Sequence, residues 1–321
     1  MSMDISTDHK PRVSVVMPLF NALPYLAEAM ESILSQTLRD IELIVVDDGS
    51  TDGSAALAMA TARRDPRVRV LLRPHAGVEA VNVGVAAARA KYIARMDADD
   101  IAISTRLERQ AAFLDAQGDC VAVGSWLERT DPFGSPAGLQ ETPVDHETID
   151  GALIRGEGWP IVQGTTMYRK SALRAAGGWR ADFGWVEDLD LFLRLAEVGR
   201  LANIPEVLYR YRRHPKSVCP SYYASMCERI ADVVAAAYRR RGLGDPPAAL
   251  ALRPDLPKKH STAELYRNWA CHAIHRRRPR LARWHAAQAL WREPWRLHSW
   301  RVLAWSVRCE GGEDETRKQA A

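Results

Sequence analysis

The sequence contains no run of about 18 or more uncharged apolar residues, the length that a membrane-spanning helix requires. Its first twelve residues, MSMDISTDHKPR, carry two aspartates and lack the apolar core of a secretory signal. The five cysteines are widely scattered and form no Cys-x-x-Cys pair, which argues against a zinc ribbon or a disulfide framework. We therefore expect residues 1–12 to be a flexible tail and the protein to be cytoplasmic with reduced thiols.

Two glycine-rich phosphate-binding patterns are also missing. The chain has neither the Gly-x-Gly-x-x-Gly fingerprint of dinucleotide-binding folds nor a Gly-Lys-Ser/Thr phosphate loop. No Ser/His/Asp or Cys/His arrangement suggests a covalent intermediate. What is present is the composition of an ordinary globular protein, with 321 residues of which 47% are hydrophobic and 26% are charged. This length allows one large domain, or a main domain with an appendage.

Short β-branched runs alternate with helical patterns in the first hundred residues. Strands are predicted over 13–18, 41–48, 67–72 and 91–96, with helices over 23–37 and 77–90 between them. This alternation predicts an α/β fold with a mostly parallel, Rossmann-like sheet flanked by helices. Ligands bind such sheets at the carboxyl ends of the strands.

The rest of the chain predicts further elements. These are a helix over 105–117, strands over 121–125, 164–170 and 204–214, a short helix capped by Ser171, and a helix over 186–199. The segment 131–143 is rich in Pro and Gly and is predicted to be a loop. From about residue 222 the pattern is helical, with a Pro-rich interruption over 244–260.

Polar residues gather where the predicted parallel strands end. The sequence reads PLFN after the first strand, DDGSTDG after the second and DADD, with Asp97, Asp99 and Asp100, after the fourth. Carboxylates this close raise one another's pKa unless a positive charge lies between them. They could spread into water as a loop or hold Mg²⁺ or Mn²⁺, which prefer oxygen ligands. Their place at the end of a parallel strand favours the cation site.

Other acids allow two interpretations each. Asp48 could accept a hydrogen bond from a base N–H, or Asp48 and Thr51 could merely cap the following helix. Glu187 and Asp188 could simply stabilise a helix N-terminus, or Asp188 could be a general base that takes a proton from an attacking hydroxyl. His214 could ligate a metal, although a lone histidine is more often a surface residue or a satisfied core residue.

Together these stretches resemble the family 2 glycosyltransferases, which have the GT-A fold. VSVVMPLFNALPYLAEAMESILSQT and IELIVVDDGSTDGS resemble the family's N-terminal signature. NVGVAAARAKYIARMDADDIAISTRLERQAAFL resembles its DxD region, and VEDLDLFLRLAEVGRLANIPEVLYRYRRH its base-bearing helix and closing strand. The resemblance runs from about Val13 to His214, with the motifs in the family's order.

The resemblance implies roles for particular residues. The nucleotide site would be formed by Pro18, Phe20, Asn21, Asp48, Asn82, Asp97 and Asp99, with Asp48 bonding the base. Asp97 would lie near the ribose or the metal, and Asp99 would be the principal ligand of Mn²⁺ or Mg²⁺, with His214 as a further candidate. Asp188 would be the catalytic base, and Glu187 would support it or orient the acceptor.

The activity implied is metal-dependent, inverting transfer of a sugar from a nucleotide-sugar donor, with UDP favoured, to a saccharide or lipid-linked saccharide acceptor. The implied setting is cell-surface polysaccharide or glycolipid synthesis at the inner face of the cytoplasmic membrane. Two alternatives stay open. A sugar-phosphate nucleotidyltransferase would normally show a Gly-rich N-terminal phosphate loop, and a degenerate family member would bind a nucleotide without turnover.

These motifs predict a GT-A domain over 13–218, with a nucleotide-binding half over 13–103 and an acceptor half over 104–218. The remaining 219–321 is predicted to be a helical, basic, Trp-rich region. Between Tyr266 and Arg308 lie ten arginines, one acid and six of the ten tryptophans. This surface could contact anionic lipid with tryptophans at the interface. Alternatively, the tryptophans pack on the catalytic domain and the arginines are solvated. No nucleic-acid-reading motif accompanies the arginines.

Overall fold

The computed structural model describes residues 10–157, 159–217, 223–247 and 261–310. The chain divides into two compact units. The first comprises Met1–Leu127, Gln140–Tyr211 and Ala224–Leu256, and the second comprises Glu128–Leu139, Arg212–Tyr223 and Pro257–Ala321. The predicted tail over 1–12 lies largely outside the described residues. Helix α8 (Tyr223–Arg241) thus packs with the first unit rather than with the C-terminal helices.

Four parallel strands form the N-terminal part of the first unit, in the order β3-β2-β1-β4. They are β1 (Val13–Leu19), β2 (Ile41–Asp47), β3 (Val68–Leu72) and β4 (Tyr92–Arg95). The connecting helices are α1 (Leu23–Leu34), α2 (Ser54–Ala62) and α3 (Glu79–Ala87). The predicted α/β alternation is confirmed here.

The nine-stranded sheet becomes antiparallel beyond β4. The remaining strands are β8 (Met167–Arg169), β6 (Cys120–Thr130), β9 (Arg200–Arg212), β5 (Ile101–Ala102) and β7 (Pro136–Gln140). The path continues from β4 through β8, β6 and β9 to β5, and β7 pairs with β6. The parallel character predicted from the sequence is therefore confined to β1, β2, β3 and β4.

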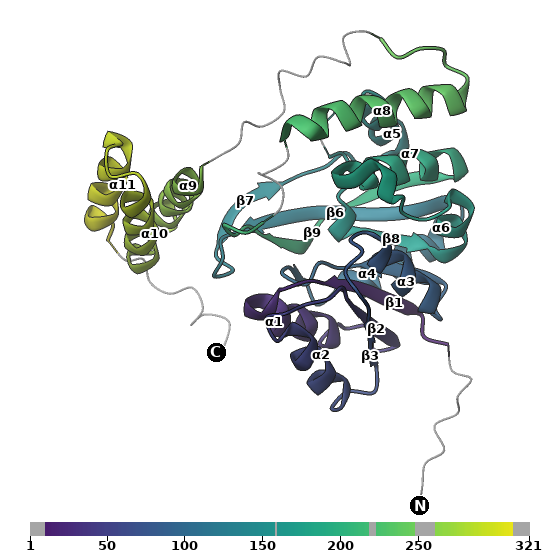
Figure 1. Ribbon diagram of the computed structural model, residues 1–321, viewed down its shortest axis with the longest axis horizontal. Helices are drawn as coiled ribbons and strands as arrows, with labels where there is room; N and C mark the ends of the chain where they lie inside the picture. The colour runs from purple at the N-terminus through teal and green to yellow at the C-terminus, as the bar shows by residue number, and fades with distance from the viewer. Residues whose placement is uncertain (1–9, 158, 218–222, 248–260, 311–321) are drawn as a thin grey trace, which may run out of the picture. The chain divides into compact units, whose positions relative to one another are not determined.

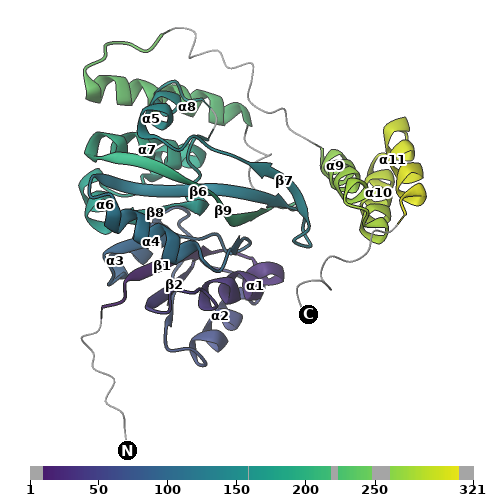
Figure 2. The same cartoon turned by 180° about the vertical axis from the view of Figure 1, so that it is seen from behind.

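Helices cover the sheet. Besides α1 to α3 they are α4 (Arg106–Ala116), α5 (His146–Ile154), α6 (Lys170–Ala176), α7 (Glu187–Val198) and α8, with 3-10 turns at Gln163–Thr165 and Ala181–Val186. In both Figure 1 and Figure 2, α5, α7 and α8 lie over the part of the sheet that β6, β8 and β9 form. Strands β1 and β2 are almost wholly buried, as expected for a parallel sheet with helices on its faces.

Close helix–sheet packing explains one glycine of α3. A Cβ at Gly84 would lie 2.4 Å from Cγ1 of Val16, so only glycine lets α3 pack this closely on β1. The packing fixes α3, and with it the loop that precedes the helix, against the carboxyl ends of the parallel strands.

Three sequence-based expectations about local structure are wrong. The segment predicted as a loop over 131–143 contains β7, because β6 runs on to Thr130 and turns back through Asp131, which accepts hydrogen bonds from the N–H groups of Phe133 (2.9 Å) and Ser135 (2.8 Å). Ser171 does not cap a helix, since α6 begins at Lys170 without a side-chain cap. The strand predicted over 164–170 is shortened to β8 by the preceding 3-10 turn.

The second unit contains three helices, α9 (Thr262–His275), α10 (Pro279–Arg292) and α11 (Leu297–Arg308). Ser261 caps α9 by accepting a hydrogen bond from the N–H of Glu264 at 3.1 Å. His285 of α10 is fully buried, with its Nε2 2.7 Å from a carboxylate oxygen of Asp131 in the β6–β7 hairpin. Among the described residues, no helix has both the length and the apolar character needed to cross a bilayer.

Candidate active site

The ends of β1, β2 and β4 meet at one edge of the sheet. Leu19 pairs with Asp47, and Val16 of the same strand pairs with Arg95. Because these strands are parallel, the polar loops that follow all three leave from that edge. The convergence predicted from the sequence is confirmed, and this edge is the candidate donor site.

The loops after β1 and β2 are tied together by side chains. Asn21 has a left-handed φ of 51°, a conformation that Asn tolerates better than most residues. Its side-chain oxygen accepts a hydrogen bond from the N–H of Thr51 at 2.8 Å, and its own N–H donates to the hydroxyl of Ser50 at 3.0 Å. Asp52 accepts a hydrogen bond from the N–H of Leu23 at 3.0 Å. The edge of the site is thus held in one arrangement, and Asn21 acts first as a scaffold residue.

Asp48 organises the loop after β3. Its carboxylate is buried and accepts hydrogen bonds from the N–H groups of Ala76 (2.9 Å) and Gly77 (2.8 Å), and Nδ1 of His75 lies 2.8 Å away. The expected alternative, capping of α2 by Asp48 and Thr51, is wrong, since the N-cap is Gly53. Each carboxylate oxygen can accept more than one hydrogen bond, so a contact of Asp48 with a base stays a prediction.

An aromatic pair lies beside Asp48. The rings of Phe20 and His75 have centroids 4.6 Å apart at an interplanar angle of 35°, and Phe20 is 51% exposed. Such an exposed aromatic surface at a strand end suits stacking of a planar base. Phe20 was predicted for this site, whereas His75 was not. The sequence feature that could have indicated His75 is its position in RPHAG, directly after the third strand.

Two of the three aspartates after β4 have partners within the protein itself. Asp97 lies 2.6 Å from Nη1 of the buried Arg95, and buried Asp100 accepts a hydrogen bond from the hydroxyl of Tyr209 at 2.7 Å. Asp99 is partly exposed. The repulsion among these carboxylates therefore does not by itself require a bound cation, which corrects the inference that the sequence alone suggested.

A second buried arginine also contacts the strand end that leads into the DxD loop. Arg106, the first residue of α4, is fully buried and donates a hydrogen bond to the backbone oxygen of Arg95 at 2.7 Å. Its guanidinium lies 4.9 Å from the ring centroid of Tyr209. Burial lowers the pKa of Arg106 to about 10, so the group stays charged at neutral pH. Neither arginine was predicted. Arg95 could have been noticed as a charged residue inside the otherwise apolar end of the run KYIARM.

A glycine allows a close approach to the DxD loop. A Cβ at Gly164, in the 3-10 turn before β8, would lie 2.8 Å from Oδ2 of Asp97 and 2.8 Å from the hydroxyl of Tyr209. Only a residue without a side chain fits there.

The carboxylates at this edge suit a metal site that a bound phosphate would complete. The described part of the chain contains no group of three or more His, Cys, Asp or Glu side chains placed to hold a metal ion. Magnesium, however, commonly takes one or two carboxylates together with substrate phosphate oxygens. Asp97 and Asp99 suit that incomplete ligand set. His214 lies beyond the end of β9 in the second unit, where its Nδ1 accepts a hydrogen bond from the N–H of Lys216 at 3.2 Å, and its role as a ligand stays a prediction.

Glu187 and Asp188 begin α7 and are partly buried. Burial raises the pKa of both carboxyl groups, and the charge of Asp188 raises that of Glu187 further. Asp97 also raises the pKa of Glu187, whereas Arg95 lowers the pKa of both acids. The acid pair thus lies within electrostatic range of Arg95 and of Asp97 in the DxD loop. Acids that only favoured a helix N-terminus would have lowered pKa values, so this burial points to a functional role.

An apolar cavity explains the environment of Asp188. The carboxylate lines this cavity and accepts a hydrogen bond from the N–H of Leu189 at 2.8 Å. The other lining residues are Leu153, Gly156, Trp159, Pro160, Ile161, Val186, Leu189, Phe192 and Ile230. Such walls solvate a charge poorly, which disfavours the ionised form of Asp188.

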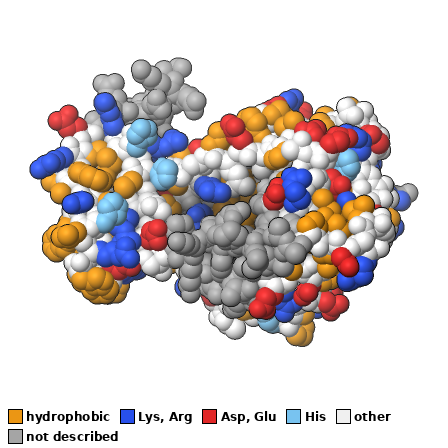
Figure 3. Space-filling view, turned by 90° about the horizontal axis from the view of Figure 1, so that it is seen from above, with side chains coloured by type: hydrophobic (Ala, Val, Ile, Leu, Met, Phe, Trp, Pro, Cys, Tyr) orange, Lys and Arg blue, Asp and Glu red, His pale blue; other side chains and the backbone are white. Residues whose placement is uncertain are grey.

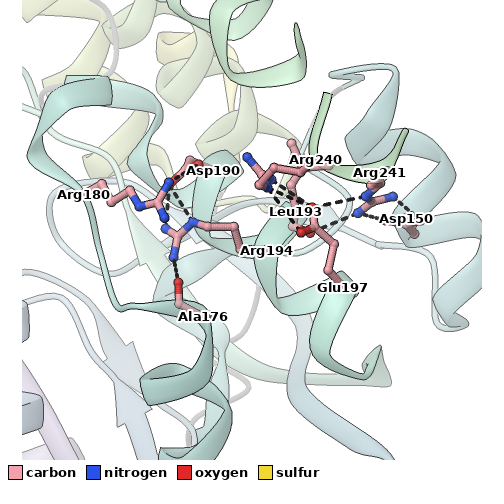
Figure 4. Close-up of polar contacts among 9 residues, drawn as sticks. All are labelled: Asp150, Ala176, Arg180, Asp190, Leu193, Arg194, Glu197, Arg240 and Arg241. Carbon is pink, nitrogen blue, oxygen red and sulfur yellow. Dashed lines mark hydrogen bonds and ion pairs between the residues drawn. The ribbon is translucent and has the colours of Figure 1, made fainter. Parts of the chain in front are cut away.

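Ion pairs fix α7, and with it the acid pair. Arg241 of α8 contacts Asp150 of α5 through two nitrogens at 2.8 Å each, and Arg240 contacts Glu197 of α7 at 2.9 Å (Figure 4). On the same helix, buried Asp190 and Arg194 form an ion pair. The Arg240–Glu197 contact ties α7 to α8, which Arg241 in turn ties to α5.

Asn82 serves the scaffold. Its amide nitrogen donates to the backbone oxygen of Trp179 at 2.8 Å, and its amide oxygen accepts a hydrogen bond from the N–H of the same residue at 3.0 Å. These bonds join α3 to the chain between α6 and α7. They explain Asn82 without a nucleotide, and the predicted nucleotide contact stays a prediction.

Known proteins share both the sequence pattern and the fold. The model of the glycosyl transferase family 2 matches residues 14–177. EpsE of Bacillus subtilis (strain 168), provisionally named a glycosyltransferase, is 36% identical over 208 residues, covering 63% of this chain and 73% of EpsE.

Two solved structures are similar in fold. Residues 1–349 of TarS from S. aureus, in complex with UDP-GlcNAc, give a TM-score of 0.57 at 16% identity and cover 93% of this chain and 92% of that one. The mannosyltransferase PcManGT from Pyrobaculum calidifontis, in complex with GDP-Man and Mn²⁺, gives 0.53 at 19% identity and covers 94% of this chain and 81% of that one. The chain is a member of glycosyl transferase family 2 with a fold similar to those of known glycosyltransferases.

Proposed function

We propose that this glycosyltransferase is inverting and moves a sugar from a nucleoside-diphosphate donor to an acceptor hydroxyl, with Asp188 as the general base. The observation that carries the proposal is the burial of Asp188 beside the DxD loop. Burial raises the pKa of Asp188, so its ionised form is a stronger base than an ordinary aspartate.

The donor would lie at the common edge of β1, β2 and β4. Its base would stack on Phe20 and His75 and contact Asp48, with Pro18 and Asn21 shaping the loop beneath. UDP is the proposed nucleotide by family resemblance, and the UDP-GlcNAc complex of the S. aureus structure supports it. The GDP-Man complex of the archaeal structure makes guanosine the main alternative.

Asp97 and Asp99 would hold Mn²⁺ or Mg²⁺ together with the diphosphate, and the Mn²⁺ complex of the archaeal structure supports this. A divalent cation there would offset the negative charge of the departing nucleoside diphosphate. Arg95 holds Asp97 in position through a contact of 2.6 Å made within the protein.

The acid pair would divide two tasks. Two adjacent buried carboxyls do not ionise together easily, so one proton is shared unequally between them. Glu187, whose pKa is raised by both burial and Asp188, would keep its proton and orient the acceptor by hydrogen bonding. Asp188 would accept the proton of the acceptor hydroxyl as that oxygen attacks the anomeric carbon. A single displacement inverts the anomeric configuration.

The proposed setting is cell-surface polysaccharide or glycolipid synthesis at the inner face of the cytoplasmic membrane, with a saccharide or lipid-linked saccharide as acceptor. Family resemblance supports the setting, and the basic, Trp-rich sequence of the C-terminal helices supports the location.

Slow hydrolysis of the donor tests the reaction without knowledge of the acceptor, because water can replace the acceptor hydroxyl. We expect the protein with Mn²⁺ to release nucleoside diphosphate from one of a panel of UDP- and GDP-sugars, and NMR to show inversion in the first sugar formed. Asp188→Asn should bind the donor with similar affinity and lose about 10²–10⁴-fold in rate. Retention of configuration, or an unimpaired Asp188→Asn variant, would refute the base assignment. Donor binding without turnover in the wild type would favour the degenerate family member.

A further inference from the structure

The connection between α10 and α11 exposes an unusual number of large apolar side chains. Trp291 is 78% exposed, Trp295 is 76% exposed and Leu297 is 74% exposed. Trp300 is 53% exposed, and its ring N–H donates to the backbone oxygen of Pro294 at 2.8 Å, which holds it against the same connection. We call these four apolar side chains and Pro294 the tryptophan corner. A folded protein rarely leaves such a group in water unless something covers it.

The exposed face of α11 continues this surface. Val302 and Ser306 are buried and turn one side of the helix inward, with Val302 packing against Ala270 and Ala286. At 3.6 residues per turn, Leu297, Trp300, Ala304 and Val307 lie on the outward side, next to a strip formed by Arg301 and Arg308. The outward face is therefore amphipathic, with apolar and basic halves side by side. In the view of Figure 3, hydrophobic, basic and histidine side chains, with a few acids, lie side by side on the part of the surface that the C-terminal helices form.

Helices α10 and α11 contain no acid, and the exposed acid Glu310 follows the end of α11. The one acid between Tyr266 and Arg308 is Glu293, and it is neutralised internally by the buried Arg267 at 2.6 Å. Within the described residues, Arg301 and Arg308 make no ion pair with an acid. The exposed arginines therefore give the surface a positive field, which attracts an anionic partner.

We propose that the tryptophan corner and the outward face of α11 dock on the surface of an anionic lipid bilayer. Tryptophan combines an apolar ring with a polar N–H and is enriched at the boundary between headgroups and acyl chains. Arginines beside it meet lipid phosphates, and each basic residue near such a surface adds to the affinity. A helix with one apolar and one basic side lies in the plane of that boundary. The proposed attachment is peripheral, through the side chains of these helices.

Other occupants fit the surface less well. A nucleic acid would be attracted by the arginines, but it would leave the aliphatic Leu297 and Val307 exposed. A second copy of this chain would cover the apolar residues but would place two basic surfaces against each other, which costs free energy. A bilayer with anionic headgroups can cover the apolar side chains and also attract the arginines.

Flotation with vesicles tests the proposal on the full-length protein without donor or metal, so the result does not depend on the transfer reaction. We expect at least about tenfold stronger binding to vesicles of equal parts phosphatidylglycerol and phosphatidylcholine than to phosphatidylcholine alone. Raising NaCl from about 0.05 to about 0.5 M should weaken the binding, because salt screens the charges.

Paired variants separate the two contributions. Trp291→Ser/Trp295→Ser and Arg301→Gln/Arg308→Gln should each reduce binding about tenfold or more, with unchanged thermal unfolding because the side chains are exposed. Matched controls are Leu243→Ser, which removes another exposed apolar side chain, and Arg63→Gln/Arg64→Gln, which removes two exposed charges at the end of α2. Both should bind like the wild type.

Four outcomes would overturn the proposal. The first two are that the folded protein does not bind anionic vesicles, or that it binds neutral vesicles equally well. The third is that both paired variants bind vesicles like the wild type. The fourth is that the protein self-associates with rising concentration, that the tryptophan variant abolishes this association, and that no vesicle binding is seen. Retention by RNA with no vesicle binding would assign the surface to nucleic acid instead.

Discussion

Burying two neighbouring carboxyl groups destabilises the folded state. Glu187 and Asp188, at the start of α7, are such a pair. The pKa of each group is raised by burial, which is the reverse of what a helix N-terminus does to an acid. Two acids placed where their ionised forms are disfavoured do not stabilise the fold, so their placement indicates a catalytic role.

The raised pKa of Asp188 should be visible in the rate of donor hydrolysis. The base must be ionised, so activity should fall as pH falls through its raised pKa. We expect the midpoint of this acid limb to lie clearly above about 3.9, the ordinary value for aspartate. The measurement is kcat/KM from pH 4 to pH 8. A midpoint near 4 would contradict a buried base.

Replacing Glu187 by Gln should stabilise the protein. The folded-state pKa of Glu187 is raised, so between about pH 5 and pH 8 the folded chain holds a proton that the unfolded chain has lost, and wild-type stability falls as pH rises through this window. Glu187→Gln removes this loss and should raise Tm by roughly 2–4 °C at pH 8, with less effect at pH 5. Glu31→Gln, at an exposed position of α1, is the control. A lower Tm at pH 8 would be inconsistent with the burial described.

Arg95 should matter for stability because its removal leaves Asp97 without its buried partner. We expect Arg95→Met to cost about 3–5 kcal/mol in urea unfolding, against less than about 0.5 kcal/mol for Arg63→Met on the surface. Arg95→Met/Asp97→Asn should recover part of the loss, since the two residues contact each other. Additive effects would show that the ion pair contributes little.

At the scale of elements, α7 owes its position to neighbours that are distant in sequence. The contacts of Arg241 with Asp150 and Glu197 join α8, α5 and α7. We expect Arg241→Ala to destabilise the protein by about 2–4 kcal/mol and to lower the hydrolysis rate through displacement of the acid pair, whereas exposed Arg239→Ala on the same helix should do neither. Unfolding and rate should be measured on the same samples. A loss of stability with an unchanged hydrolysis rate would contradict the claim that α8 positions the acid pair.

Sequence periodicity was sufficient for the elements that local patterns define. The strands β1 to β4 and the helices α1 and α3 are continuous apolar or amphipathic runs, whereas no range was predicted for α2. The DxD motif follows β4 and the Glu-Asp motif begins α7. Strand β7 was missed because its Pro- and Gly-rich sequence resembles a loop, and only pairing with β6 makes it a strand. Long-range pairing is not encoded in a local window.

The same limit applies to the site. Asp97, Asp99 and Asp188 were picked out as acids at element ends, whereas His75 and Tyr209 were missed, because their partners Asp48 and Asp100 lie 27 and 109 positions away in the sequence. The predicted nucleotide residues Asn21 and Asn82 are explained by scaffold hydrogen bonds that no motif shows.

For the whole molecule, the predicted boundary between 218 and 219 does not coincide with the division by packing. The β6–β7 hairpin packs with the C-terminal helices, where buried His285 contacts Asp131. Strand β6 therefore begins in the first unit and ends in the second. This arrangement joins a proposed donor site and a proposed lipid-binding surface in one protein.

Ligand-dependent unfolding tests the central claim most directly, namely that the edge formed by β1, β2 and β4 binds a nucleotide-sugar donor through the DxD carboxylates. Wild type and Asp99→Ala would be unfolded thermally with UDP, GDP, dTDP or CMP, each with and without Mn²⁺. A ligand at about 100 times its Kd stabilises by about 2.7 kcal/mol. We predict a rise in Tm of several degrees with one nucleotide, requiring Mn²⁺ and lost in Asp99→Ala. No rise with any nucleotide, or a rise that Asp99→Ala retains in full, would contradict the donor site described.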